Sequence, residues 1–177
     1  PGGDFEELKT FIENKELNVE YIILTHGHAD HIGAVPEVKE YFNAKILIHE
    51  DDYEMLKNSE MNYSSRMGYR KIEIEADKKI KHGEIIKIGN VLLEVIHTPG
   101  HTRGSICIKC ENKIFSGDTL FAGSIGRTDL EGGSFEQIIA SINEKLLVFP
   151  DDLEVYPGHG PSTTIGTEKK YNPFIRT

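Results

Sequence analysis

The segment Thr25–His31 reads Thr-His-Gly-His-Ala-Asp-His and directly follows the apolar run Tyr-Ile-Ile-Leu. Its three histidines and one aspartate offer nitrogen and oxygen ligands of the kind that proteins use to bind metal ions. In an extended chain alternate residues point to the same side, so His26, His28 and Asp30 can converge on one point while His31 points toward a neighbouring one. We interpret the segment as a metal-binding loop that can supply two adjacent ions, rather than as a polar loop that happens to be rich in histidine.

Three further candidate ligands each follow an expected strand within a glycine-containing loop. His101 lies in Thr-Pro-Gly-His-Thr, Asp118 in Ser-Gly-Asp-Thr and His159 in Pro-Gly-His-Gly. Glycine lets the backbone approach other groups closely and adopt left-handed conformations, which a loop needs to aim a side chain at a shared centre. Each motif alone is common, but the three together with residues 26–31 form a specific metal-binding pattern.

The elements that must position these residues alternate between strands and helices. Apolar spacing predicts strands at about 20–25, 44–49, 84–88, 91–97, 105–110, 113–116 and 152–156. It predicts a first helix with Asp4 as N-cap that runs through Ile12, and two more at about 30–43 and 51–57. A further helix runs from Ser134 through about Leu147, and a last one begins near Ser162–Thr164. Gly89-Asn90 and Glu111-Asn112 are typical of hairpin turns, and Ser134 with Gln137 forms a capping-box pattern. The class is therefore α/β or α+β, and the polar segment 58–70 carries no clear pattern.

The composition is that of one soluble globular domain, with 38% hydrophobic and 28% charged residues among 177. The formal net charge of −9 argues against nucleic acid as a partner, because nucleic-acid-binding proteins carry basic patches. No apolar run approaches the roughly 20 residues that span a bilayer, so we expect no membrane segment. We interpret Cys107 and Cys110 as ordinary strand cysteines, one pointing inward and one outward, and expect a cytoplasmic location.

The chain resembles the metallo-β-lactamase-fold hydrolases over nearly its whole length, and most closely their short glyoxalase II-like (hydroxyacylglutathione hydrolase-like) branch. The motifs that carry the resemblance are Thr25–His31 (THGHADH), Thr98–Thr102 (TPGHT), Gly117-Asp118, Gly126–Asp129 (GRTD) and Pro157–Gly160 (PGHG). The resemblance implies a four-layered αββα sandwich with the metals at the strand-end edge between two sheets. It also implies that one or two strands of the first sheet are missing before Pro1, so residues 1–177 form one N-terminally truncated domain whose open sheet edge favours a dimer.

By resemblance, the seven candidates divide between two metal ions: His26, His28 and His101 bind metal 1, Asp30, His31 and His159 bind metal 2, and Asp118 bridges both. Asp30 and Asp118 are the candidate catalytic residues. The nitrogen and oxygen ligands suit two divalent ions, Zn²⁺ first, with Fe or Mn as alternatives. A hydroxide that bridges two ions about 3.5–4 Å apart would be the nucleophile. A small-molecule thioester of the hydroxyacylglutathione type fits as substrate, because a thiolate with a pKa near 8.5 leaves readily.

Two other functions remain open at this point: a mononuclear iron oxygenase resembling the persulfide dioxygenases of the same fold, which share the Gly-Arg-Thr-Asp motif, and a metal-binding module without catalysis. The chain ends at Thr177, without the C-terminal helical domain with which full-length glyoxalase II holds glutathione.

Four further residues lie outside the predicted ligand set. We assign structural roles to His49 and His97, the latter as a residue that orients a ligand, and expect His82 to be exposed. Arg127 is either a pocket cation or, as we favour, a buried partner of Asp129 that fixes the loop.

Overall fold

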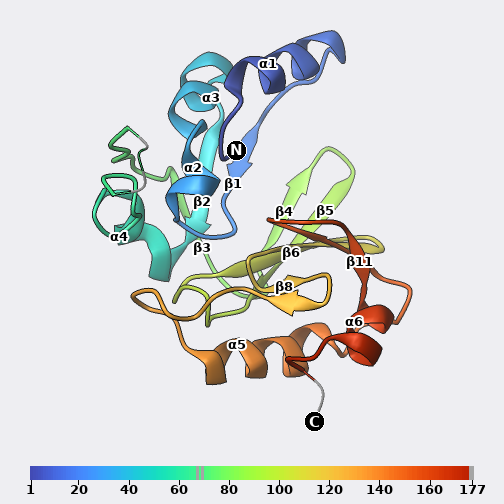
Figure 1. The fold of residues 1–177 in the computed structure, drawn as a ribbon. Helices are drawn as coiled ribbons and strands as arrows, with labels where there is room; N and C mark the ends of the chain where they lie inside the picture. Colours follow the sequence, from blue (N-terminus) through green and yellow to red (C-terminus); the bar gives the residue numbers. More distant parts are fainter. Residues whose placement is uncertain (67, 69, 176–177) are drawn as a thin grey trace. The chain divides into compact units, whose positions relative to one another are not determined.

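The computed structural model describes residues 1–66, 68 and 70–175 and divides the chain into two compact units, Pro1–Lys79 and Ile80–Thr177 (Figure 1). We call them unit 1 and unit 2. Each consists of a β-sheet with helices packed against it through its own hydrophobic core. No helix among the described residues is long and apolar enough to cross a membrane.

Unit 1 carries a three-stranded sheet in the order β1-β2-β3, with β1 and β2 parallel. Its elements are α1 (Phe5–Asn14), β1 (Tyr21–Ile23), α2 (Ala29–Ile32), α3 (Val35–Phe42), β2 (Lys45–His49), a 3₁₀ turn η1 (Glu50–Asp52), α4 (Tyr53–Leu56) and β3 (Lys78–Ile80), whose last residue is the first of unit 2. Ile22 pairs with Ile46 in the sheet, and both pack against Ile32 and Val35 of the helices. Buried aliphatic side chains thus fix the strand β1 that leads into the histidine-rich segment.

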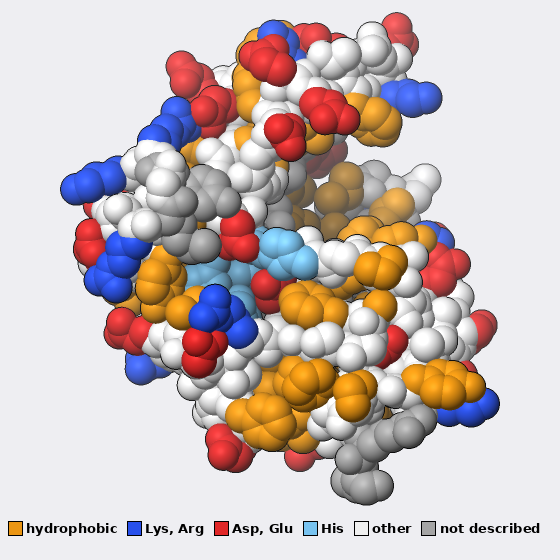
Figure 2. Space-filling view, in the orientation of Figure 1, with side chains coloured by type: hydrophobic (Ala, Val, Ile, Leu, Met, Phe, Trp, Pro, Cys, Tyr) orange, Lys and Arg blue, Asp and Glu red, His pale blue; other side chains and the backbone are white. Residues whose placement is uncertain are grey.

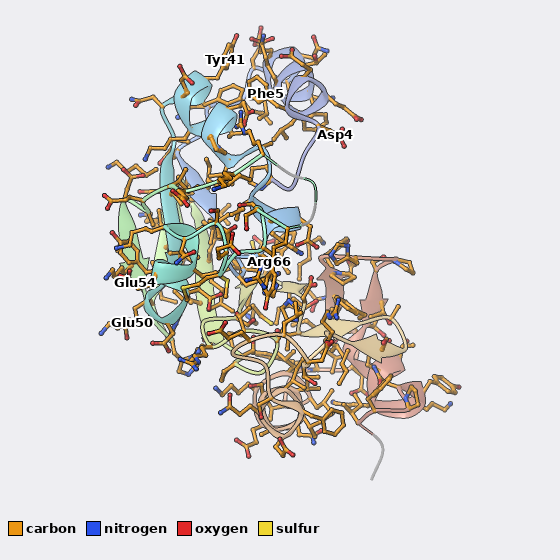
Figure 3. The ribbon with its side chains drawn as sticks, turned by 60° about the vertical axis from the view of Figure 1, so that its left-hand side comes forward. Asp4, Phe5, Tyr41, Glu50, Glu54 and Arg66 are labelled. Carbon is orange, nitrogen blue, oxygen red and sulfur yellow. The ribbon has the colours of Figure 1, made fainter. Side chains whose placement is uncertain are left out.

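The first helix begins where predicted, although its cap differs from the prediction. Asp4 precedes α1 with a left-handed backbone (φ 54°) and makes no side-chain capping bond, so Asp4 as a capping side chain is wrong. Phe5 anchors the helix instead: its ring lies edge-on against Tyr41 of α3, with centroids 5.9 Å apart (Figure 3).

The helix predicted at 30–43 is in fact two helices, α2 and α3, separated at Gly33 and Ala34. Pro36 lies in the first turn of α3, where its missing N–H costs nothing. Within one continuous helix the same proline would remove a hydrogen bond to Ile32 and clash with that carbonyl. The chain therefore breaks just before it, and Asp30 and His31 lie on the short helix α2.

Unit 2 carries a six-stranded sheet in the order β11-β10-β7-β6-β5-β4 and a small hairpin, β8-β9. Its elements are β4 (Ile85–Ile88), β5 (Val91–His97), β6 (Ile106–Cys110), β7 (Lys113–Gly117), β8 (Leu120–Phe121), β9 (Ser124–Ile125), α5 (Phe135–Ser141), a π-helical turn η2 (Ile142–Leu146), β10 (Glu154–Pro157), β11 (Thr163–Thr164) and α6 (Ile165–Tyr171). Four short strands, β3, β8, β9 and β11, were not predicted, because each has only two or three residues and carries no readable alternation.

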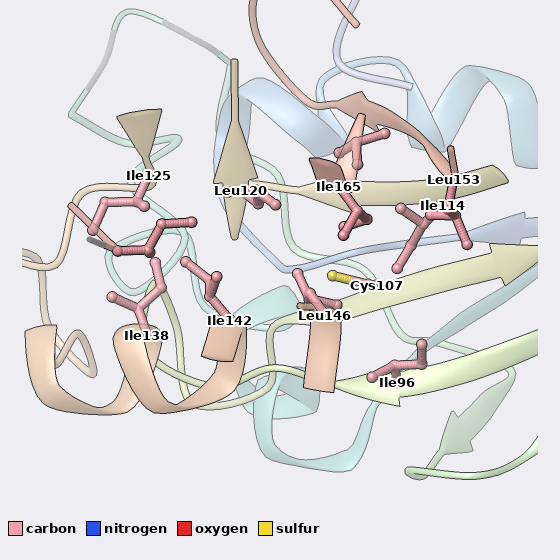
Figure 4. Packing of buried hydrophobic residues seen from close by; sticks show 12 residues of the cluster. Ile96, Cys107, Ile114, Leu120, Ile125, Ile138, Ile142, Leu146, Leu153 and Ile165 are labelled. Carbon is pink, nitrogen blue, oxygen red and sulfur yellow. The ribbon is translucent and has the colours of Figure 1, made fainter. Parts of the chain in front are cut away.

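Both predicted hairpin turns are confirmed. Ile88 pairs with Val91 across Gly89-Asn90, and Cys110 pairs with Lys113 across Glu111-Asn112. The resulting meander carries one face of apolar side chains, on which α5, η2 and α6 pack (Figure 4). Other hydrophobic side chains remain on the surface of unit 2, in the lower part of Figure 2.

The predicted cap of α5 is confirmed for one of its two bonds. The Ser134 hydroxyl accepts the Gln137 N–H at 3.3 Å, whereas the Ser134 N–H donates to the Gly100 carbonyl at 2.8 Å. The start of this helix is thus tied to the residue before the candidate ligand His101. The helix predicted to run through about Leu147 is α-helical only to Ser141 and continues as the π-helical turn.

The two cysteines are free thiols, with Cys107 fully buried in the core and Cys110 half-buried, as the strand alternation predicts. Burial raises the pKa of the Cys107 thiol to about 11. Of the unassigned segment 58–70, Met67 and Tyr69 lie outside the described residues, and the rest forms turns without a strand or helix.

Candidate metal centre

The predicted ligands of unit 1 lie together at the end of β1. The ring centroids of His26 and His28 are 4.9 Å apart, those of His26 and His31 are 4.1 Å apart, and His31 Nε2 lies 3.8 Å from an Asp30 carboxylate oxygen. The extended conformation that we expected for the whole segment ends at His28, which precedes α2. The helix brings His31 beside His26. We call these four residues the unit 1 ligand cluster.

Two residues outside the predicted ligand set, Asp52 and Asn62, hold the backbone of this cluster. The Gly27 N–H donates to the buried Asp52 carboxylate at 3.2 Å, and the Ala29 N–H donates to the Asn62 carbonyl at 2.9 Å. The Asn62 amide in turn donates to the carbonyls of Met55 and Ile72. Asn62 lies in the segment to which no pattern was assigned, so only its burial, which a single sequence does not display, marks its role.

The predicted ligands of unit 2 converge on one carboxylate oxygen. His101 Nε2 lies 3.7 Å from Asp118 Oδ2, and His159 Nε2 lies 3.6 Å from the same atom. These three side chains come from the loops after β5, β7 and β10. Each was predicted to lie in a glycine-containing loop directly after a strand. Because these three strands end at the same edge of the six-stranded sheet, the three side chains lie together there. We call them the unit 2 ligand cluster.

The orientation of His101 is set by the Gly-Arg-Thr-Asp loop. His101 Nδ1 lies 2.7 Å from the Arg127 carbonyl, and because a carbonyl only accepts, Nδ1 carries the proton. Nε2, the nitrogen near Asp118, is then the one with a lone pair for a metal. The close approach requires Gly126, since a Cβ there would lie 1.8 Å from the Asp118 carbonyl oxygen. The role of the Arg127 carbonyl was not predicted, because only the side chain of Arg127 carries a signal in the sequence.

The Arg127 side chain forms a two-bond ion pair with Asp129, with both N–O distances 2.7 Å. The pairing that we favoured is present, but the prediction that Arg127 is buried is wrong, because its side chain is 60% exposed. The guanidinium hydrogen bonds lower the pKa of the Asp129 carboxyl to about 2. The pair closes the loop that carries the Arg127 carbonyl.

His159 is the most exposed of the predicted ligands of unit 2, with 53% of its side chain accessible. Its ring lies edge-on to Phe121 at 6.2 Å, and the neighbouring Gly158 N–H donates to the Gly117 carbonyl at 2.8 Å. This backbone bond ties the His159 loop to the residue before Asp118.

The remaining histidines have structural contacts. His49 accepts the Asp51 N–H at 3.3 Å and so caps η1. His97 Nε2 lies 2.8 Å from the Arg103 carbonyl in the loop that carries His101, in agreement with an orienting role. His82 is exposed, as expected, and accepts the His97 N–H at 3.3 Å.

The donor atoms of both clusters are imidazole nitrogens and carboxylate oxygens without a thiolate. This set fits divalent transition-metal ions, for which neutral imidazole and carboxylate are common ligands. In unit 2 the Asp118 carboxylate faces two imidazoles, one from His101, which precedes it in the sequence, and one from His159, which follows it. The donor chemistry therefore matches a metal centre.

Comparisons with known proteins agree with this chemistry. The sequence profile of the Metallo-beta-lactamase superfamily matches residues 1–159. Hydroxyacylglutathione hydrolase GloC of Haemophilus influenzae is 41% identical over 181 residues, which cover 100% of this chain and 85% of that protein.

Two crystal structures are also similar. BLEG-1 B3 metallo-beta-lactamase has a TM-score of 0.95 and 42% identity, with 100% of this chain and 87% of that chain covered. TTHA1623 in a di-iron-bound form has a TM-score of 0.88 and 32% identity, with 98% and 86% covered. The predicted fold class is thereby confirmed, and the chain belongs to the metallo-β-lactamase superfamily of metal-dependent hydrolases.

Proposed function

We propose that this protein hydrolyses a thioester of the hydroxyacylglutathione type, with the two ligand clusters together holding two divalent metal ions. In this proposal units 1 and 2 form one metallo-β-lactamase domain. The observation that carries it is the placement of His101 and His159 at 3.7 and 3.6 Å from one Asp118 oxygen. A carboxylate that faces two separate imidazoles is suited to bridge two ions.

The proposed ligands are those of the two clusters: His26, His28 and His101 for one ion, Asp30, His31 and His159 for the other, and Asp118 for both. When bound, such ions lower the pKa of water and polarise a carbonyl group. The nitrogen and oxygen donors suit zinc, and a similar protein crystallised in a di-iron-bound form makes iron the first alternative.

The chain itself contributes orientation and charge. The Arg127 carbonyl fixes the proton of His101 on Nδ1, so Nε2 is presented to the centre without a rotation or a proton transfer. Asp118 and Asp30 place negative charge beside histidines, which stabilises bound cations. The Asp118 backbone is held by the close approach of Gly126, so its carboxylate is aimed by the main chain.

The thioester substrate is supported by the similarity to hydroxyacylglutathione hydrolase GloC. It also fits the chemistry, because a thiolate leaving group with a pKa near 8.5 needs little help from an acid, and no acid is assigned in either cluster. A second candidate, β-lactam hydrolysis, is favoured by the 42% identity and TM-score of 0.95 to BLEG-1. Both reactions add water to an acyl carbon, so the same clusters serve either.

Metal analysis combined with parallel assays tests the proposal. We expect two equivalents of Zn or Fe per chain and turnover of a hydroxyacylglutathione thioester well above that of a chromogenic cephalosporin. Oxygen consumption with glutathione persulfide would identify the oxygenase alternative, and bound metal without any turnover would identify a binding module. The variant His101→Ala, which removes a proposed ligand, should lose metal and turnover. Its matched control is His82→Ala, because His82 is a histidine of unit 2 outside the cluster.

A further inference from the structure

A carboxylate outside both ligand clusters is buried in unit 2. Glu168 on α6 is only 1% exposed and accepts three hydrogen bonds. Oε2 accepts the Gly123 N–H at 2.9 Å and the Asn172 amide at 2.8 Å, and Oε1 accepts the Thr163 hydroxyl at 2.6 Å. Burying a carboxylate is costly unless donors replace its water, and three donors from three segments do so here.

Asn172 extends this network from Gly123 to Ser124, the next residue of the β8-β9 hairpin. Its amide donates to the Ser124 carbonyl at 2.9 Å as well as to Glu168. Asn172 is fully buried, and its side-chain oxygen Oδ1 accepts the Phe174 N–H at 3.0 Å. Glu168 and Asn172 thus bind an N–H and a C=O at the tip of the hairpin, Gly123 and Ser124, as a neighbouring strand would.

The hairpin connects this network to Asp118. It begins two residues after Asp118 and ends at Ile125, immediately before Gly126. At its base the Gly126 N–H donates to the Thr119 carbonyl, and the Ser116 hydroxyl donates to the Leu120 carbonyl at 2.7 Å. A hairpin held at its tip therefore cannot tilt without moving the backbone that carries Asp118.

The same carboxylate connects to the loop of His159. Thr163 begins β11 and pairs with Val155 of β10, so the loop that carries His159 closes at Thr163. The other end of that loop is held by the Gly158 N–H on the Gly117 carbonyl. Oε1 of Glu168 thereby fixes the closing end of the His159 loop, while Oε2 fixes the hairpin that follows Asp118.

We infer that Glu168 is a positioning residue that holds Asp118 and His159 at the separation needed to share a metal. The metal part of this inference rests on the function proposed above, whereas the coupling of the two loops does not. One side chain sets the distance between loops that lie far apart in sequence. If Glu168 only anchored α6, removing its side chain would loosen the two loops no more than it loosens the rest of unit 2.

Hydrogen exchange of the metal-free protein separates these possibilities. In Glu168→Ala we expect amide exchange in both 119–127 and 158–164 to rise at least about tenfold relative to the strands β5 and β6. Glu168→Gln should restore slow exchange, because its carbonyl accepts from Gly123 and Asn172 while its amide donates to Thr163. Lys169→Ala is the matched control: the neighbouring Lys169 bonds Asp151 and the Phe149 carbonyl, away from both loops.

Thr163→Val keeps the test open if Glu168→Ala does not fold, since it removes only one hydroxyl. It should accelerate exchange in 158–164 and leave 119–127 unchanged. Uniform acceleration across unit 2 in Glu168→Ala, equal rates in Glu168→Ala and Lys169→Ala, or an unchanged 158–164 segment in Thr163→Val would each overturn the coupling.

Metal titration then tests the consequence for binding. Loss of an outer partner typically weakens metal affinity by about 10–100-fold, and we expect Glu168→Ala to show such a loss for the second equivalent, with recovery in Glu168→Gln. Wild-type affinity in Glu168→Ala would overturn the positioning role. If the wild-type protein bound no metal, the proposed function would fail, and the exchange rates would still decide whether Glu168 couples the loops.

Discussion

The two ligand clusters are built in different ways. The unit 1 cluster takes its four side chains from residues 26–31, one continuous segment that runs from beyond the end of β1 into α2. The unit 2 cluster takes one side chain each from three loops, at positions 101, 118 and 159. In the first the spacing along the chain brings the ligands together, whereas in the second the sheet and the contacts between loops must do so.

This difference determines where each cluster is vulnerable. Within unit 1, Asp52 and Asn62 each accept one hydrogen bond from the backbone of residues 26–31. The ligands of this segment stay neighbours as long as it keeps its helix. Within unit 2, a shift of any loop separates the ligands. The outer contacts of that cluster accordingly come from separate segments: the Arg127 carbonyl, the close approach of Gly126 and the network of Glu168.

The largest effect is expected from Asp118→Ala, because it removes the group on which both unit 2 histidines converge. We expect kcat/KM to fall by more than the roughly 10–100-fold that loss of an outer partner causes, together with loss of bound metal. Activity assays paired with metal analysis measure both. Asp152→Ala, which removes an exposed carboxylate of the same unit, should retain both. Near-normal turnover in Asp118→Ala would contradict a bridging role.

A pair of glycine substitutions compares the two clusters directly. In Gly126→Ala the new Cβ would lie 1.8 Å from the Asp118 carbonyl oxygen, so the backbone must shift. In Gly27→Ala the new Cβ would meet the Met55 sulfur at 2.9 Å, and a flexible methionine can move away. We expect Gly126→Ala to lose about 2 kcal/mol or more of unfolding free energy, as overpacked sites do, and most of its metal affinity.

Gly27→Ala should lose clearly less than Gly126→Ala in both measurements, which are denaturant unfolding and metal titration. Gly3→Ala serves as the neutral control, because a Cβ there meets nothing within 4 Å. Equal losses for Gly27→Ala and Gly126→Ala would show that the two clusters depend on their backbones to the same extent.

The same contrast explains what the sequence could predict. Strand alternation and glycine loops predicted the hairpin turns and the ends of β5, β7 and β10, because these depend on local residues. The break between α2 and α3 was missed although Pro36 marked it, since the apolar spacing continues across the break. The short strand β11 and the hairpin β8-β9 have too few residues to show a period.

The candidate ligands could be named from sequence because their types are rare and chemically specific. The residues that hold them could not. Asn62 and Glu168 look like ordinary polar residues of a loop and a helix, and only their burial reveals a role. The Arg127 carbonyl is a backbone group, which any residue type supplies, so no side-chain pattern points to it.

An effect that is expected only at alkaline pH concerns the core beneath the unit 2 cluster. Burial raises the pKa of Cys107 from 9.0 to about 11, so the thiol stays protonated in the folded protein after it ionises in the unfolded chain. Below pH 9.0 it has no effect on stability, and between pH 9.0 and about 11 stability falls as the unfolded state loses the proton. This loss should reach about 2–3 kcal/mol.

Denaturant unfolding across that pH range, compared between wild type and Cys107→Ala, measures the contribution of Cys107. Cys107→Ala should lose this part of the pH dependence, whereas Cys110→Ala, a change at the half-buried thiol, should keep it. Identical slopes for wild type and Cys107→Ala would show that the core of unit 2 admits water at Cys107.

The smallest effect is expected at the exposed pair of Arg127 and Asp129. Asp129→Asn keeps one of the two hydrogen bonds and leaves the Arg127 carbonyl on His101, so we expect metal affinity to fall less than about tenfold. The lowered pKa of Asp129 means that the pair forms fully above its ordinary value of 3.8 and is lost only as the pH falls toward 2. The ratio of wild-type to Asp129→Asn affinity should therefore stay constant across neutral pH, with Glu154→Gln, a change in another exposed pair of unit 2, as the control. A loss as large as that of Asp118→Ala would instead make Arg127 part of the site itself, and the unit 2 cluster would then include a cation.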